Sequence, residues 1–362
     1  FPDKPEYNPR ADEVFGVRTD TVPDGNLLWS PRVGFNWDPS GDGTKQLRGG
    51  VGLFTGRTPY VWISNNYGRT GTRQTTIEAR GEIPFNPDPF DQPTDIGGAS
   101  SEELNAVDPD FNFPQTWRMN LAYDHRLPWW QIVATAEVMY AKSTNEINYL
   151  NLNIEQTGET LPFDNRPLYQ TVDRDYSGAY YLTNTDKGDA LNVIFKAELP
   201  YGELPFWGIA SYTYGEANVI NDATSSRAVS NWQYNEAFDP NNVGLSTSDY
   251  EIEHRMMINL NYEFNRNSRW STTVSAFWNH RSGRPYMSIY DWSFGSINGD
   301  FYTSNDPIYV PSGADDVVIT NGTWAQLDAY LERTGLAGYK GQVTPRNPYT
   351  SPWITQTDLA IR

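Results

Sequence analysis

Apolar and polar residues alternate along about nine segments of the chain, and this period of two constrains the fold more than any other feature. In Arg255–Phe264, every second residue from Met256 onward is apolar, whereas Asn259 and Asn261 fall between them. Such alternation places the apolar side chains on one face of a β-strand, and about ten residues is the length that a tilted strand needs to cross a bilayer. The same pattern occurs, with varying clarity, in Ser30–Trp37, Gln46–Thr55, Thr116–Asp124, Gln131–Tyr140, Leu191–Leu199, Phe206–Tyr214, Trp270–Asn279 and Trp353–Ile361.

The connections between these segments alternate in length. Transmembrane barrels have tight turns toward the periplasm and long loops outside, whereas a soluble β-sandwich has short connections at both ends. The pattern therefore predicts an all-β, antiparallel transmembrane β-barrel wall with long extracellular loops. The short connections are Asp38–Lys45, Arg126–Trp129, Pro200–Pro205 and Asn265–Arg269, and the long ones are roughly 56–113, 144–189, 218–249 and 281–351.

Composition agrees with a barrel wall and excludes several other classes of protein. Hydrophobic residues make up only 38% of the 362 residues and the mean hydropathy is -0.64, yet aromatic residues reach 14%. A disordered chain would be poor in aromatics, whereas a wall around a polar lumen needs only a thin apolar surface. No run of about 18 apolar residues predicts a transmembrane helix. Cysteine is absent, which excludes disulfides, and the net charge of -18 argues against nucleic acid as a partner.

Aromatic residues gather next to the short turns. Amphipathic rings prefer the headgroup level of a membrane, so these residues resemble a periplasmic girdle, although aromatics also favour strands in general. The six residues are Trp37, Tyr123, Trp129, Trp130, Phe264 and Trp270.

The long loops are rich in Pro, Gly, Asn and Asp, as in Pro84–Pro93 and Thr344–Pro352. Because proline breaks strand ladders, we expect irregular loops there rather than additional strands. Only Thr323–Arg333 shows helical spacing of its apolar residues, so we expect a short helix in that loop. A propeller is not predicted, since no repeat of 20–50 residues is found.

Five blocks of the sequence, in order, resemble the barrel of TonB-dependent outer-membrane receptors of the Oar-like type. They are Trp29–Arg57 (WSPRVGFNWDPSGDGTKQLRGGVGLFTGR), His254–Tyr262 (HRMMINLNY), Arg281–Tyr286 (RSGRPY), Asn305–Pro311 (NDPIYVP) and Ser351–Arg362 (SPWITQTDLAIR). The resemblance implies a barrel of about 22 strands around an N-terminal plug. It also implies location in the bacterial cell outer membrane and transport of a bulky substrate that is driven by the TonB complex.

On this resemblance, we expect residues 1–362 to be a fragment of one receptor barrel domain. The plug, an N-terminal carboxypeptidase-regulatory-like domain, a TonB box and the C-terminal strands are not found in the sequence. The expected partners are outer-membrane lipid and lipopolysaccharide (LPS), the TonB complex through the missing N-terminal region, and an unidentified substrate or surface partner. No cofactor is expected.

Polar residues that alternate with the apolar ones are expected to face the lumen or the plug. Arg48 would meet carboxylates of the plug, and the glycines around it would allow a plug or a neighbouring backbone to approach closely. The lumen candidates are Arg48, Arg118, Asn120, Lys196, Glu198, Asn259 and Asn261.

Two loop segments, Tyr60–Tyr67 and Ser230–Tyr234, carry aromatic and amide side chains of the kinds used in recognition surfaces. We consider them candidate ligand contacts, and the alternative is that they pack loop against loop. The candidates are Tyr60, Trp62, Asn65, Asn66, Trp232 and Tyr234.

The turn Asp38–Lys45 resembles a calcium loop, with oxygen ligands at Asp38, Ser40 and Asp42. It lacks the bidentate glutamate of such loops, and the same residues suit a tight turn, which is the favoured interpretation. The glycines of Leu47–Arg57 lack the signature of a phosphate loop. His125, His254 and His280 are far apart, and the acidic pairs lie in loops, so no catalytic residue is assigned and the chain is not expected to be an enzyme.

Three functions remain in view. The leading one is an outer-membrane receptor or transporter. The first alternative is an adhesive or matrix-assembly protein of the cell surface, which an upstream plug and TonB box would argue against. The second is a secreted, soluble all-β binding protein such as a lectin, in which the apolar strand faces would pack in a dry core.

Overall fold

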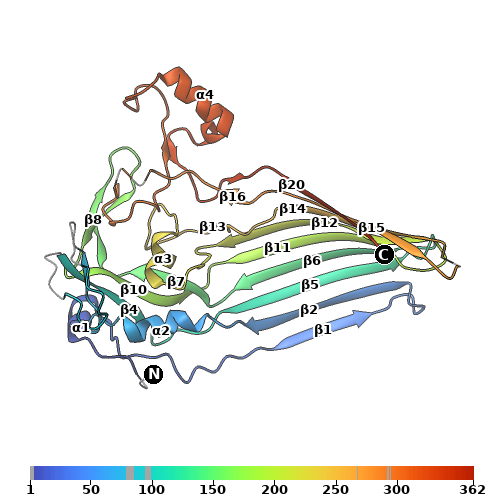
Figure 1. Ribbon diagram of the computed structural model, residues 1–362, viewed down its shortest axis with the longest axis horizontal. Helices are drawn as coiled ribbons and strands as arrows, with labels where there is room; N and C mark the ends of the chain where they lie inside the picture. The colour runs from blue at the N-terminus through green and yellow to red at the C-terminus, as the bar shows by residue number, and fades with distance from the viewer. Residues whose placement is uncertain (1–3, 79–84, 94–98, 267, 292, 294) are drawn as a thin grey trace.

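The computed structural model describes residues 4–78, 85–93, 99–266, 268–291, 293 and 295–362. A long antiparallel sheet, which we call the wall, occupies one end of the molecule, and the long connections gather at the other end (Figure 1). The wall runs in the order β1-β2-β5-β6-β11-β12-β14-β15-β20, with the short β13 paired to β12. The nine segments that alternation predicted as strands all lie in it, in sequence order.

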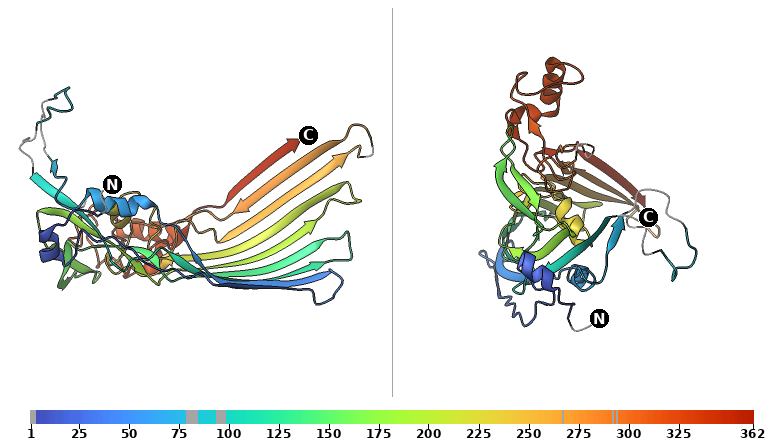
Figure 2. Two further views of the ribbon diagram at one scale, coloured as in Figure 1. Left: turned by 90° about the horizontal axis from the view of Figure 1, so that it is seen from below. Right: turned by 90° about the vertical axis from the view of Figure 1, so that its left-hand side faces the viewer.

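The wall strands have bounds close to the predicted segments. They are β1 (Arg32–Trp37), β2 (Lys45–Thr55), β5 (Gln115–Arg126), β6 (Val133–Ser143), β11 (Asp189–Leu199), β12 (Phe206–Val219), β14 (His254–Phe264), β15 (Thr272–Arg281) and β20 (Ile354–Ile361), with β13 at Ser246–Thr247. The sheet twists and curves, and in the described residues it does not close on itself (Figure 2). A closed barrel and its total of about 22 strands therefore stay predictions.

The register separates the two faces of the wall. Leu121 of β5 lies opposite Val138 of β6, which lies opposite Val193 of β11. Farther along the sheet, Leu260 of β14 lies opposite Ala276 of β15. Side chains on this apolar face are well exposed, for example Leu260 at 55%. No part of the described protein packs against this apolar face. An exposed apolar band is what a lipid-facing surface of a barrel requires.

The short turns lie together at the end of the wall away from the long connections (Figure 1). Gly41 and Gly43, in the turn between β1 and β2, have positive φ angles, which glycine adopts without strain. The six aromatic residues predicted as a girdle, Trp37, Tyr123, Trp129, Trp130, Phe264 and Trp270, are all exposed near these turns.

The expectation that the long loops hold no additional strands is wrong. They form a folded region, which we call the loop layer and which comprises the described parts of 4–29, 56–114, 144–188, 220–253 and 282–353. Its four-stranded sheet has the order β3-β4-β10-β7, and three two-stranded sheets pair β8 with β9, β16 with β19 and β17 with β18. Their bounds are β3 (Thr76–Glu78), β4 (Ala99–Val107), β7 (Glu146–Asn151), β8 (Ile154–Thr160), β9 (Pro167–Thr171), β10 (Tyr176–Thr185), β16 (Pro285–Tyr286), β17 (Tyr309–Val310), β18 (Gln342–Val343) and β19 (Tyr349–Thr350).

The expectation of a single helix is also wrong, although that helix is found. It is α4 (Trp324–Thr334), which begins at a capping box of Thr323 and Gln326. Three further helices, α1 (Pro9–Phe15), α2 (Tyr60–Gly68) and α3 (Ala228–Gln233), and a 3-10 helix, η2 (Leu336–Tyr339), belong to the loop layer. Among the described residues, no helix is long and apolar enough to span a membrane.

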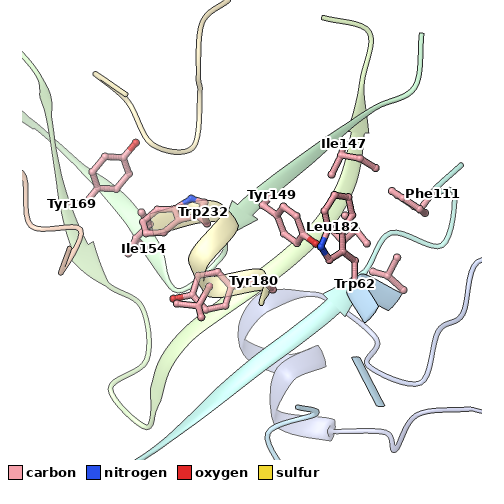
Figure 3. Close-up of a cluster of buried hydrophobic side chains, with 12 residues drawn as sticks. Trp62, Phe111, Ile147, Tyr149, Ile154, Tyr169, Tyr180, Leu182 and Trp232 are labelled. Atoms are coloured by element: carbon pink, nitrogen blue, oxygen red, sulfur yellow. The ribbon is translucent and has the colours of Figure 1, made fainter. Parts of the chain in front are cut away.

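The main hydrophobic core of the molecule lies in the loop layer, not in the wall. Trp62 of α2, Tyr149 of β7, Tyr180 of β10 and Trp232 of α3 are among twelve buried side chains that pack together there (Figure 3). A smaller cluster joins α1 to β4 and β10, and a third joins α4 and η2 to Val310. The loops therefore form a fixed structure at one end of the wall.

Candidate functional site

The polar face of the wall brings together the residues that were predicted to face the lumen. Arg48 of β2 lies opposite Ala122 of β5, which in turn lies opposite Glu137 of β6. The register continues through Thr135 and Lys196 to the strands beyond. By this register all seven lumen candidates share one face, opposite the apolar one: Arg48, Arg118, Asn120, Lys196, Glu198, Asn259 and Asn261. The face is not uniformly polar, since Met139 and Ile209 also lie on it.

A network of charges links three strands on this face. Arg48 Nε contacts Asp124 Oδ2 at 2.9 Å, and Arg48 Nη2 contacts Glu137 Oε2 at 3.3 Å. The other oxygen of each carboxylate is also bonded, because Thr135 Oγ1 donates to Asp124 at 2.6 Å and Asn120 Nδ2 donates to Glu137 at 3.2 Å. The Arg48 guanidinium thus holds two carboxylates on neighbouring strands. The Arg48 side chain remains partly exposed.

Two smaller polar contacts extend the same face. Lys196 Nζ pairs with Glu198 at 3.2 Å within β11. Asn261 Nδ2 donates to Asn259 at 3.1 Å within β14, and Ser275 Oγ donates to Asn261 at 2.7 Å. Contact of this face with a plug stays a prediction.

The glycines beside Arg48 explain why the strands approach closely here. A Cβ at Gly49 would lie 2.7 Å from the main-chain oxygen of Asn120, so a larger residue would push β2 and β5 apart. The predicted close approach therefore involves a neighbouring strand of the wall itself.

The two candidate ligand-binding segments form helices α2 and α3, and the structure brings them together. Trp62 Nε1 donates to the main-chain oxygen of Ser225 at 2.7 Å, just before α3. Trp62, Asn66 and Trp232 are buried, so these three side chains are not on the surface. This is a correction to their assignment as ligand contacts, and it follows the loop-packing alternative.

The remaining candidates in these segments are accessible. Tyr60 is 64% exposed and Tyr234 is 59% exposed. Asn65 is half-buried and donates to the main-chain oxygen of Ser226 at 2.8 Å. Contact of Tyr60, Asn65 and Tyr234 with a ligand stays a prediction.

The turn proposed as a weak calcium candidate is held by its own hydrogen bonds. Asp38 accepts from the main-chain N–H groups of Ser40, Gly41 and Gly43 at 2.7 to 2.9 Å. Thr44 donates to Asp42 from its hydroxyl and its main-chain N–H, which lowers the pKa of Asp42 to about 2. These contacts are those of a tight turn, and they occupy oxygens that a calcium ion would need.

Histidines do not form a metal centre in the described residues, and no group of three His, Cys, Asp or Glu side chains is arranged there to hold a metal ion. His254 and His280 instead stack on the ring of Trp353, with centroid distances of 5.9 and 4.7 Å. They add to the aromatic surface at the loop end of the wall.

A buried ionic cluster in the loop layer was not predicted from the sequence. The Arg166 side chain is fully buried, with Nε at 2.7 Å from Asp164 and Nη1 at 2.8 Å from Asp306. Burial, and then the negative charge of Asp300, raises the pKa of Asp306 to about 6. The residues lie in two different long connections, so no spacing in the sequence indicated that they meet.

A cavity of about 350 Å³ opens beside this cluster, and its lining includes Asn151, Arg174, Tyr176 and Asp300. Its lining is mixed, with Ile154 and Phe301 beside the polar residues, and it is open to solvent. It lies between the four-stranded sheet and the segment that carries Asp300.

Comparison with known proteins gives one result for the whole chain. The family model described as "Outer membrane beta barrel domain" matches residues 7–362. No curated protein matches the chain.

Proposed function

The chain belongs to the outer membrane β-barrel domain family and lies in the bacterial outer membrane, and from this premise we propose that it forms part of the wall of a TonB-dependent, Oar-like transporter of bulky substrates. The observation that carries the proposal is the charged network around Arg48 on the face opposite the apolar band. Transmembrane barrels carry a polar inner face in general, and a charged network that stays partly exposed on that face offers a plug a place to dock.

The geometry of this network suits contact with a second, removable element. Arg48 spans Asp124 and Glu137, yet its side chain keeps 36% of its surface exposed. A partly exposed guanidinium can exchange one carboxylate for another at modest cost, because surface ion pairs contribute only about 0–1 kcal/mol. The proposed plug would dock on such groups and leave them during transport.

The loop layer supplies the receptor part of this proposal. Its core fixes α2 and α3 against β7 and β10, so the exposed Tyr60 and Tyr234 are presented from rigid elements. Rigid presentation of aromatic side chains lowers the entropy lost on binding. A substrate would bind there first and then pass along the polar face.

The same loop layer supports a second candidate function, adhesion or matrix assembly at the cell surface. A folded layer with its own hydrophobic core is a recognition module whether or not anything passes below it. Transport and adhesion differ in whether the periplasmic energy system engages the protein.

Binding to TonB separates the two functions. The full-length protein would be extracted from outer membranes in detergent and passed over the immobilised periplasmic domain of the TonB protein from the same organism. Transport predicts retention that free TonB domain competes away. Passage without retention, together with adhesion of intact cells that the purified loop-bearing protein inhibits, would refute transport and leave the adhesive function.

A further inference from the structure

Three polar side chains of the loop layer are completely buried within seven consecutive positions. Asp300, Asn305 and Asp306 expose 0%, 2% and 1% of their surfaces. They follow β16 and precede β17, in a segment without regular secondary structure. Burial of carboxylates is costly unless opposite charge or hydrogen bonds compensate for it.

The compensation inside the protein is incomplete. Arg166 pairs with Asp164 and Asp306, and among the described residues no salt bridge reaches Asp300. Asp300 is held by three neutral donors, the Ser296 hydroxyl at 2.8 Å, the Asn305 amide at 2.8 Å and the Tyr302 main-chain N–H at 2.9 Å. Three carboxylates against one guanidinium leave two negative charges unbalanced.

Two buried oxygens of this cluster also lack a hydrogen-bond donor in the part of the chain that the structure describes. They are Asp306 Oδ2 and Asn305 Oδ1. Asn305 donates to Asp300 through its Nδ2, and the Oδ1 on the other branch of the same carboxamide group has no donor among the described residues. Asp306 uses its Oδ1 for Arg166, and within the described residues its Oδ2 makes no hydrogen bond of good geometry, although the main-chain N–H of Ile297 lies close to this carboxylate. Buried acceptors in native proteins are rarely left unpaired, so these two oxygens call for a further partner, and either a water molecule or a cation would supply it.

We propose that Asp300, Asn305 and Asp306 bind a divalent cation of the calcium type. Calcium takes oxygen ligands from carboxylates and amides, and fills its remaining positions with main-chain carbonyls and water. The set differs from a zinc centre, because it holds two carboxylates and an amide rather than nitrogen or sulfur ligands. Asp300 also lies against the solvent-open cavity, so an ion would approach the cluster from that side, although the Asp300 side chain itself exposes none of its surface.

The cation would join segments from three long connections. The main-chain oxygen of Asn305 accepts from Ala237 N–H at 3.0 Å, and that of Asn298 accepts from Tyr169 N–H at 2.7 Å. Asp306 reaches the β8–β9 loop through Arg166. An ion at this position therefore stabilises the loop layer as a whole, and this holds whether the protein transports a substrate or not.

Calcium titration of the full-length protein in detergent tests the proposal. The protein would be stripped with EGTA and heated in CaCl₂, in MgCl₂ or in NaCl of equal ionic strength, with unfolding followed by near-UV circular dichroism. We expect a saturable rise in the melting temperature with CaCl₂, with an apparent Kd of about 10⁻⁴ to 10⁻³ M, as in extracellular calcium modules. Calorimetry should show the same binding step.

Variants locate the effect. Asp306→Asn keeps an oxygen for Arg166 but removes a ligand charge, so the apparent calcium affinity should fall about tenfold or more, since charge count tunes such sites. The Asn305→Asp variant should have a lower melting temperature than the wild type in EGTA, because the new carboxylate lies next to that of Asp300. Its melting temperature should rise more than that of the wild type when CaCl₂ is added. Asp164 also contacts Arg166 but is not a proposed calcium ligand. The Asp164→Asn variant should therefore keep the wild-type calcium response.

Several results would overturn the proposal. One is a melting temperature of the wild type that CaCl₂ does not change, which would mean that water fills the space. Another is an equal calcium response in Asp306→Asn and Asp164→Asn. Loss of the response in Asp42→Asn would assign the ion to the β1–β2 turn instead.

Discussion

Arg166 and Asp306 form a fully buried ion pair, at 2.8 Å, between two loops that are 140 residues apart in the sequence. Arg166 also donates to Asp164 at 2.7 Å and to the main-chain oxygen of Pro307 at 2.6 Å. The pair shows that the long connections above the wall are tied together by specific contacts.

Replacing Arg166 with leucine should strongly destabilise the loop layer. The substitution leaves Asp164 and Asp306 buried without their cation, and removing one partner of a buried pair costs about 3–5 kcal/mol. Limited proteolysis of the loops in outer-membrane vesicles would measure the effect. Arg10→Ala is the matched control, because the exposed Arg10 pairs with Asp173 and Asp175 in contact with solvent, where ion pairs contribute little to stability. Equal protease sensitivity of the two variants would contradict the assignment.

Trp232 should be the most sensitive position in the main core. It is 2% exposed, its ring packs against Tyr302 at a centroid distance of 5.2 Å, and its Nε1 donates to Asn241 at 3.0 Å. Trp232→Ala should cost about 3–5 kcal/mol of stability, measured from denaturant unfolding of the loop layer. Tyr234 lies two residues away and its side chain is exposed, so Tyr234→Ala should change the stability of the loop layer little. A mild effect of Trp232→Ala would show that the helices do not pack as described.

The wall strands could be predicted from the sequence because their side chains face two different environments. The alternation in Arg255–Phe264 predicts the strand that the structure shows as β14. The residues of Asp38–Lys45 predict the turn that the structure shows between β1 and β2. Helix α4 could be predicted because Trp324, Leu327 and Leu331 have helical spacing, and the structure adds a capping box of Thr323 and Gln326 at its start. Local signals of this kind do not depend on distant partners.

The loop layer lacked such local signals, and its structure depends on distant contacts. β4 pairs in parallel with β10, about 70 residues later, and neither strand shows clear alternation. Helices α2 and α3 follow Pro59 and Arg227, neither of which makes a side-chain cap hydrogen bond, so no capping signal marked their starts. Helix α1 did carry readable signals, an Asn8 cap and a C-terminal Gly16, and these were missed.

The same distinction applies to the candidate site. Alternation could place the seven lumen candidates on one face of the wall, because it fixes the face of a strand; that this face lines a lumen stays a prediction. Trp62 and Trp232 were misassigned because recognition surfaces and buried cores use the same aromatic residues, and only the contact of α2 with α3 separates the two uses. Asp306 and Arg166 gave no signal, since each is an ordinary loop residue until the fold joins them.

The carboxyl group of Asp42 should titrate well below its ordinary range. Hydrogen bonds from Thr44 and Ser40 lower its pKa from 3.8 to about 2. A lowered folded-state pKa means that these contacts stabilise the turn above pH about 4 and are lost as the pH falls toward 2. Carbon-13 NMR of labelled aspartate in micelles would follow the titration, and Thr44→Val should raise the midpoint. A wild-type midpoint near 3.8 would contradict the described turn.

The central claim is that the apolar face of the wall contacts lipid while the opposite face is shielded from it. These 362 residues contain no cysteine. With any cysteine outside them replaced by serine, single replacements Ile258→Cys, Asn259→Cys, Leu260→Cys and Asn261→Cys in β14 can carry a spin label in the full-length protein in bilayers. Collision rates with oxygen, which concentrates in lipid, should be high at positions 258 and 260 and low at 259 and 261. High rates at 259 and 261, or no alternation along β14, would contradict the account.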